Sequence, residues 1–460
     1  MRDVGKFRNN MRIILGFLIT LFSVLVVFLG YSILTYGESW FATPYNPRLQ
    51  QTISSVDMGA VYDVNGQKLA WSVGDERNYD DEKRLRLSTA HVLGDVTGMT
   101  IGAQTRFGKY LYGKAQSIGD RVEAVIQGST GKGSDVYLTI DSELSEYAYK
   151  LLDERNGAVV VMNYKTGELL IHTNYPSFDP VSVAEDELID TALVDRVTMG
   201  RYPPGSTMKI ITAAAAIDAG IDFEYECTGE TLVDNVLIRC AGGSAHGEED
   251  LAKAFTSSCN TYFALLSVKL GEERLLEAAK KFGFNEEFNF SDITLYKSNF
   301  ELSGKESDLA WAGVGQYKDL VTPLHMTMIT SAVANRGIMP EPKLLKAVST
   351  NGSMSHQAVP TVYREVLSAN TAEILAGMMV RVVRMGTATS AAVENVIVCG
   401  KTGTAEYTVD GEIKNHSWFT GYIADEEYPY AISVIVEGAG YGSKYASPLA
   451  QKVLNKIVNG

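Results

Sequence analysis

Two residues near the middle of the chain have the types and spacing that acyl-transfer chemistry needs. Ser206 and Lys209 follow the turn-forming run Pro203-Pro204-Gly205 and open an apolar segment, "STMKIITAAAAIDAG". Residues i and i+3 of a helix are neighbours, so the lysine amine can reach the serine hydroxyl. A lysine can remove the proton of a serine when burial or a nearby cation keeps its amine neutral. The pair predicts a serine nucleophile with a lysine base, although a serine at a helix start is most often only a cap.

Two further short motifs extend this set. They are Ser258-Cys259-Asn260 and Lys401-Thr402-Gly403-Thr404, each inside a periodic segment. The second motif is embedded in a predicted strand, where Gly400 and Gly403 are expected to let a ligand approach the backbone closely.

Each of these motifs also has a second copy in the chain. Ser368-Ala369-Asn370 fits the first pattern, but Asn370 with Glu373 suits a helix cap better than a catalytic group. Lys165-Thr166-Gly167 fits the second, but it falls in a predicted hairpin turn where its amine would be solvated. Context therefore selects the copies at 258–260 and 401–404.

The three motifs in this order resemble those of the penicillin-binding proteins of the monofunctional class B type, a branch of the superfamily that includes the serine β-lactamases. Further segments of the resemblance, in chain order, are "YLTIDSELS", "NGAVVVMNYKTGELL", "YPSFDP", "VTPLHMTMITSAVANRGIMPEP" and "SWFTGYIA". The resemblance runs from about residue 136 to the C-terminus and implies a peptidoglycan D,D-transpeptidase that β-lactams acylate.

The resemblance also implies roles for single residues. Ser206 would attack the D-Ala-D-Ala terminus of a stem peptide, Lys209 would be the general base, and Ser258 would shuttle a proton. Asn260 would hold Lys209 and the substrate amide. The backbone N–H groups of Ser206 and Thr404 would form the oxyanion hole. The substrate carboxylate would be held by the motif Lys401, Thr402, Gly403 and Thr404.

Other functions share the same three motifs. A D,D-carboxypeptidase or a β-lactamase would use the same acyl-enzyme and release it to water. A membrane-bound β-lactam sensor would need further spans and a larger cytoplasmic segment, and an inactive cell-wall scaffold would not need all three motifs intact. Cross-linking transpeptidation is therefore the preferred interpretation.

The N-terminus predicts a membrane anchor. Residues 13–34 form an uncharged run of 22 residues, which is long enough to cross a bilayer as a helix. A cleavable signal peptide would have a shorter apolar core of ~7–15 residues. Basic residues precede the run, so the positive-inside rule places the N-terminus in the cytoplasm and the rest of the chain outside. These residues are Arg2, Lys6, Arg8 and Arg12.

Composition and the resemblance together set expectations about partners. A net charge of −14 argues against a nucleic-acid partner, because phosphate binding needs a basic face. We expect peptidoglycan stem peptides and β-lactams as ligands, a membrane-embedded glycan polymerase as a partner, no cofactor, and a location on the extracytoplasmic side of the bacterial cell membrane.

The four cysteines leave three alternatives open. Cys227 and Cys240 could form a disulfide or remain free, and His246 lies six residues further on. A zinc site from these three residues lacks an obvious fourth ligand, so no metal ligand is predicted.

The organisation predicted from these patterns is an α+β fold. A five-stranded antiparallel sheet flanked by helices is built from two early and three late strands. A small β-rich membrane-proximal module and one transmembrane helix precede it. The predicted divisions are a cytoplasmic tail (1–12), an anchor (13–35), the membrane-proximal module (36–135) and a transpeptidase domain (136–460).

Overall fold

The computed structural model describes residues 2–41, 57–74, 76–96, 99–113, 115–116, 132–183, 191–221, 223–409 and 411–460, with the side chains of 2–5, 33–41 and 409 left out. Parts of the predicted membrane-proximal module therefore lie outside the described residues.

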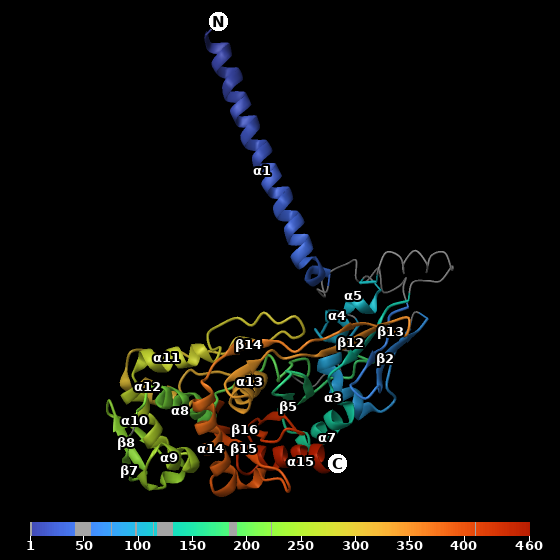
Figure 1. Ribbon diagram of the computed structural model, residues 1–460. Coiled ribbons are helices and arrows are strands. Elements are labelled where there is room, and N and C mark those ends of the chain that lie inside the picture. The colour runs from blue at the N-terminus through green and yellow to red at the C-terminus, as the bar shows by residue number, and fades with distance from the viewer. Residues whose placement is uncertain are drawn as a thin grey trace.

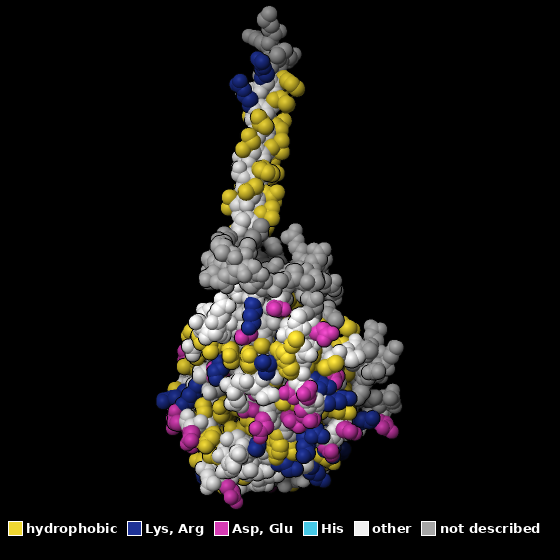
Figure 2. Space-filling view, turned by 90° about the vertical axis from the view of Figure 1, so that its right-hand side faces the viewer, with side chains coloured by type: hydrophobic (Ala, Val, Ile, Leu, Met, Phe, Trp, Pro, Cys, Tyr) yellow, Lys and Arg dark blue, Asp and Glu magenta, His cyan; other side chains and the backbone are white. Residues whose placement is uncertain are grey.

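The first helix, α1 (Arg2–Phe41), extends away from the body of the molecule (Figure 1). Its stretch Lys6–Ser32 is long and apolar enough to cross a membrane. Figure 2 shows apolar side chains along this helix and basic side chains near its free end. The helix is longer than the predicted anchor, because helical backbone continues past the apolar run on both sides.

A five-stranded antiparallel sheet forms the centre of the body, as predicted. Its strand order is β15-β16-β17-β5-β6, so two early strands lie beside three late ones. Both faces of this sheet are covered, which explains the continuous apolar sequence of a strand such as β5. The bounds are β5 (Gly157–Asn163), β6 (Leu169–Tyr175), β15 (Val398–Val409), β16 (Glu412–Ile423) and β17 (Tyr430–Val436).

Two helices cover opposite faces of the central sheet. Helix α13 (Pro323–Ala334) contacts the sheet through Thr330, whose hydroxyl lies 2.6 Å from that of Thr420 on β16. Helix α15 (Ala446–Asn459) begins where Ser417 of the same strand accepts a hydrogen bond from its first backbone N–H. Residues 417 and 420 point to opposite faces of a strand, so the sheet lies between the two helices.

The remaining helices of the body carry or support the candidate site. Thr322 caps α13 and Pro323 occupies its first turn, a sequence signature of a helix start. The bounds of the other long helices are α7 (Ser142–Leu152), α8 (Lys209–Asp218), α9 (Leu251–Ser257), α10 (Asn260–Leu270), α11 (Glu272–Lys281), α12 (Glu306–Val314) and α14 (Ala369–Met385).

A second sheet lies between the central sheet and α1 (Figure 1). It has six strands in the order β13-β12-β4-β1-β2-β3, and helices α3 (Lys83–Leu93), α4 (Ala103–Arg106) and α5 (Gly108–Leu111) lie in the same part of the chain. Two of its strands come from late in the sequence, so this sheet is not confined to the predicted module, and the domain boundary at residue 135 stays a prediction. The bounds are β1 (Val61–Tyr62), β2 (Lys68–Val73), β3 (Glu76–Tyr79), β4 (Asp135–Leu138), β12 (Leu345–Thr350) and β13 (Ser353–Gln357).

Three small antiparallel ribbons complete the described strands. One pairs β7 (Tyr225–Cys227) with β10 (Gly247–Glu249), and another is the hairpin of β8 (Glu230–Val233) and β9 (Val236–Arg239). The third pairs β11 (Ile338–Pro340) with β14 (Val362–Glu365).

Candidate active site

The turn that carries Ser206 is pressed against the edge of the central sheet. Gly205 has a φ of +54°, and a Cβ at this position would lie 2.5 Å from the carbonyl oxygen of Thr404 on β15. The indole N–H of Trp418 donates to the carbonyl oxygen of Pro203 over 3.0 Å. Glycine is therefore required for the close approach, which places Ser206 one turn before α8, where backbone N–H groups favour developing negative charge.

Lys209 is fully buried and its amine contacts the second motif. Its Nζ donates to Asn260 Oδ1 over 2.7 Å and to the carbonyl oxygen of Ser258 over 2.8 Å, and it lies 3.4 Å from Ser258 Oγ. Burial lowers the pKa of Lys209 to about 8, although the nearby thiols of Cys259 and Cys240 act in the opposite direction. About a tenth of this amine is therefore neutral at pH 7, far more than for an ordinary lysine, and a general base must be neutral.

Ser258 joins the second motif to the third. It lies between α9 and α10 in a left-handed conformation, with φ 61°. Such a backbone costs energy in a residue with a side chain and is typical of functional sites. Lys401 Nζ donates to Ser258 Oγ over 2.8 Å, and burial followed by the charge of Lys209 holds the pKa of Lys401 well below its ordinary value. One hydroxyl thus contacts both lysines.

A cleft of about 800 Å³ opens over these groups. Residues of all three motifs line it: Ser206, Ser258, Asn260, Thr402, Gly403 and Thr404. Strand β15 is the edge strand of its sheet, so one side of its backbone has no neighbouring strand. An extended peptide can add to such an edge as a further strand, which places the peptide across the nucleophile.

The two glycines of β15 are needed for packing within the protein. A Cβ at Gly400 would lie 2.5 Å from the ring of Phe419, and a Cβ at Gly403 would lie 2.9 Å from both the carbonyl oxygen of Pro204 and Trp418 Cβ. Gly403 thereby allows β15 to approach the turn that carries Ser206. Gly403 also lines the cleft, and the expectation that these glycines let a ligand approach the backbone stays a prediction.

The second copies of the motifs lie outside the site, as predicted. The cap of α14 is Ser368 and not the predicted Asn370, which lies inside the helix: the Ser368 hydroxyl accepts from the backbone N–H of Thr371 over 3.0 Å. Lys165 lies in the turn between β5 and β6 and forms an ion pair with the exposed Glu426.

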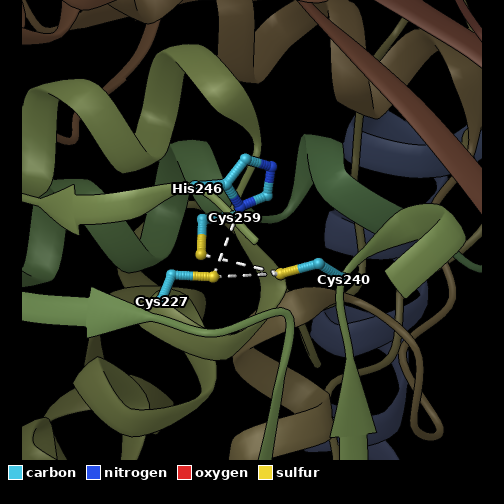
Figure 3. A group of neighbouring side chains, drawn as sticks. All are labelled: Cys227, Cys240, His246 and Cys259. Atoms are coloured by element: carbon cyan, nitrogen blue, oxygen red, sulfur yellow. Dashed lines mark hydrogen bonds between the residues drawn. The ribbon is translucent and has the colours of Figure 1, made fainter. Parts of the chain in front are cut away.

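Of the alternatives left open for Cys227 and Cys240, the structure has two free thiols and not a disulfide. Cys227 and Cys240 are free thiols whose sulfurs lie 3.7 Å apart, whereas a disulfide has an S–S distance of about 2.05 Å. Figure 3 shows that Cys259 and His246 point toward the same two sulfurs. Cys259 was missed as a partner of this group, although it is the middle residue of the motif Ser258-Cys259-Asn260.

Comparison with known proteins gives consistent matches. A family model described as the penicillin binding protein transpeptidase domain matches residues 157–459. The peptidoglycan D,D-transpeptidase MrdA of Haemophilus influenzae is 30% identical over 71% of this chain and 56% of its own length. The peptidoglycan D,D-transpeptidase PbpA of Mycolicibacterium smegmatis is 26% identical over 90% of this chain and 91% of its own.

A solved structure shares the fold across nearly the whole chain. An acyl-enzyme complex of penicillin-binding protein A from M. tuberculosis superposes with a TM-score of 0.82, covering 89% of this chain and all of that one, at 24% identity.

Proposed function

The chain belongs to the family of penicillin-binding protein transpeptidases, and from this membership and the geometry of the cleft we infer that it is a peptidoglycan D,D-transpeptidase acting through an acyl-enzyme on Ser206. The observation that carries the residue roles is the convergence of three motifs on one hydroxyl. Ser258 Oγ lies 2.8 Å from the amine of Lys401 and 3.4 Å from that of Lys209.

The acylation step uses these groups as follows. Neutral Lys209 takes the proton of Ser206, whose Oγ attacks the carbonyl carbon between the last two residues of a D-Ala-D-Ala stem peptide. The backbone N–H groups of Ser206 and Thr404 stabilise the oxyanion, a contribution of about 3 kcal/mol for each donor. Ser258 relays a proton to the departing amine, the C–N bond breaks, and D-alanine leaves.

The second step completes the cross-link. The amine of another stem peptide attacks the Ser206 ester and loses a proton to Lys209. The ester C–O bond breaks, and Lys209 returns the proton to Ser206 Oγ. In the first step, before D-alanine leaves, the hydroxyl groups of Thr402 and Thr404, with the amine of Lys401, hold the terminal carboxylate of the first substrate. Thr402 is itself positioned by Thr387, whose Oγ1 lies 2.5 Å from Thr402 Oγ1.

The apolar helix α1 supports a single-pass anchor with the body on the extracytoplasmic side. Basic residues lie at its free end and its apolar side chains are exposed along its length, so a bilayer would cover them. A substrate that is part of the wall and a partner that polymerises glycan in the membrane both suit an enzyme held at the membrane surface.

Transpeptidation and hydrolysis differ in what attacks the Ser206 ester, so acceptor use tests the function. With a small thioester or depsipeptide donor and an added D-amino acid, we expect the D-amino acid in the product and slow release of bound penicillin, over many minutes. Lys165→Ala should behave like the unchanged protein, because Lys165 lies in the remote hairpin turn. Rapid penicillin hydrolysis without D-amino acid incorporation would instead identify a β-lactamase.

A further inference from the structure

One side chain already occupies part of the free edge of β15. The carboxamide of Gln316 donates from Nε2 to the carbonyl oxygen of Thr404 over 2.9 Å, and its Oε1 accepts from the backbone N–H of Glu406 over 3.3 Å. Residues two apart in a strand direct their backbone groups to the same edge, and this edge of β15 has no neighbouring strand. Gln316 therefore bonds the edge as the peptide groups of an added strand would.

The backbone that carries Gln316 is held in place, so only its side chain can leave the edge. The backbone N–H of Gln316 donates to the carbonyl oxygen of Trp311 over 3.0 Å. The preceding residue, Gly315, is the C-cap of α12, and its carbonyl oxygen accepts from the backbone N–H of Gly205 over 2.8 Å. The Gln316 side chain itself is partly exposed and lines the cleft. Rotation about its side-chain bonds is therefore enough to free the strand edge.

A stem peptide in the proposed reaction needs the carbonyl oxygen that Gln316 occupies. The proposed oxyanion hole includes the backbone N–H of Thr404, so the carbonyl oxygen of the penultimate D-alanine lies at that N–H. In an antiparallel hydrogen-bonded pair, two opposite residues exchange both of their backbone hydrogen bonds. The N–H of the same D-alanine is therefore directed to the carbonyl oxygen of Thr404, and the side-chain amide N–H of a penicillin corresponds to it.

We propose that the carboxamide of Gln316 competes with the donor peptide for the edge of β15 and must turn away from Thr404 before acylation. This proposal rests on the proposed function. The exchange replaces one hydrogen bond to the Thr404 carbonyl oxygen by another, so a ligand with its own amide N–H restores the bond that it displaces. An unpaired strand edge also attracts unrelated extended chains, and the carboxamide occupies the edge until a donor binds.

The concentration dependence of acylation separates binding from chemistry. Stopped-flow measurements with a fluorescent penicillin give the dissociation constant of the first complex and the limiting rate of acylation. Gln316→Met keeps the length of the side chain and removes its hydrogen bonds. We expect the dissociation constant to fall about three- to tenfold, the effect of one net hydrogen bond, without a fall in the limiting rate.

The control makes the same substitution away from the cleft. Gln357 is exposed on β13, the edge strand of the six-stranded sheet, so Gln357→Met should change neither constant. A dissociation constant that is unchanged or higher in Gln316→Met than in the unchanged protein would overturn the proposal.

Thermal unfolding distinguishes competition from a purely structural role. If Gln316 only supported β15, its substitution would lower the melting temperature and also weaken penicillin binding. The proposal requires opposite directions: Gln316→Met should melt slightly lower, because it loses two hydrogen bonds, and yet bind penicillin more tightly.

A crystal structure of the penicillin acyl-enzyme tests the proposal in the unchanged protein. We expect the amide N–H of the ligand at the carbonyl oxygen of Thr404, with the carboxamide of Gln316 turned away. A Gln316 carboxamide still within hydrogen-bond distance of that oxygen would overturn the proposal. An absence of acylation in both the unchanged protein and Gln316→Met would instead contradict the proposed function.

Discussion

At the scale of single residues, the proposed general base is the buried amine of Lys209. The amine has no exposed surface and contacts two residues of the second motif, Ser258 and Asn260. Burial disfavours the charged amine, which is why its pKa falls to about 8 from an ordinary value of 10.5.

This pKa predicts the pH dependence of acylation. The base must be neutral, and the amine of Lys209 is protonated below pH 8 and neutral above it. The second-order rate of penicillin acylation should therefore rise about tenfold per pH unit up to about pH 8 and then level off. Lys209→Ala should remove the rise together with most of the rate. A rate that stays constant from pH 6 to 9 would show that Lys209 is not the base.

Sequence patterns identified most of the residues that the structure brings together at the candidate site, for a physical reason. The chemistry needs fixed residue types at short spacings, so Ser206 with Lys209, and Ser258 with Asn260, can be read directly. The proximity of Cys259 to Cys227 and Cys240 could not be read, because these residues are far apart in the sequence. The packing role of Gly403 could not be read either, because it depends on contact with Pro204, about 200 residues earlier.

At the scale of elements, the site depends on the contact between β15 and the turn at residues 203–206, which carries Ser206. Glycine at 205 and at 403 lets the backbones meet, and Gln316 strengthens the contact by donating to the carbonyl oxygen of Thr404 over 2.9 Å. The proposed oxyanion hole depends on this contact, because one of its two donors comes from each side.

A methyl group added at Gly205 or at Gly403 should push β15 and the turn carrying Ser206 apart. Gly403→Ala places a Cβ 2.9 Å from the Pro204 carbonyl oxygen, so we expect it to destabilise the protein by about 1–3 kcal/mol and to slow acylation about tenfold or more. Thermal unfolding and acylation kinetics measure both effects.

The same substitution in an open position is the control. Gly377 lies in α14 with no atom near its Cβ position, so Gly377→Ala should stabilise the protein by about 0.5–1 kcal/mol and leave acylation unchanged. Normal acylation in Gly403→Ala would show that the close contact between β15 and the turn carrying Ser206 is not required.

The two sheets differ in how far they could be predicted. Strands β5 and β17 of the central sheet are short apolar runs bounded by turn signals, and its five strands, two early and three late, could be predicted from local patterns. The six-stranded sheet pairs β4 with β12, which begins about 200 residues later, and no local pattern specifies such a partner. Part of the predicted module is therefore completed by the rest of the chain.

At the scale of the whole molecule, the cleft lies far from the end of the body at which α1 leaves it. Helix α1 leaves one end of the body, next to the six-stranded sheet, and β15, α8 and α9 lie toward the other end (Figure 1). In the proposed topology, the six-stranded sheet is a spacer that holds the cleft away from the membrane surface.

This arrangement predicts a definite topology. Protease added to cells with a permeable wall should digest the body and leave a membrane-embedded fragment of about 35 residues, the length of a helix with short flanks. Fragments are measured by immunoblot with tags at each terminus. Protection of the C-terminal tag from the protease would contradict the proposed orientation and place the body in the cytoplasm.

The central claim is that Ser206 is the nucleophile, and the position of a penicillin adduct tests it most directly. Protein treated with penicillin should gain the mass of one intact penicillin, and peptide mapping should place that mass on Ser206. Ser206→Ala should remove the adduct while the melting temperature stays close to that of the unchanged protein. An adduct on Ser258, or one that persists in Ser206→Ala, would contradict the account.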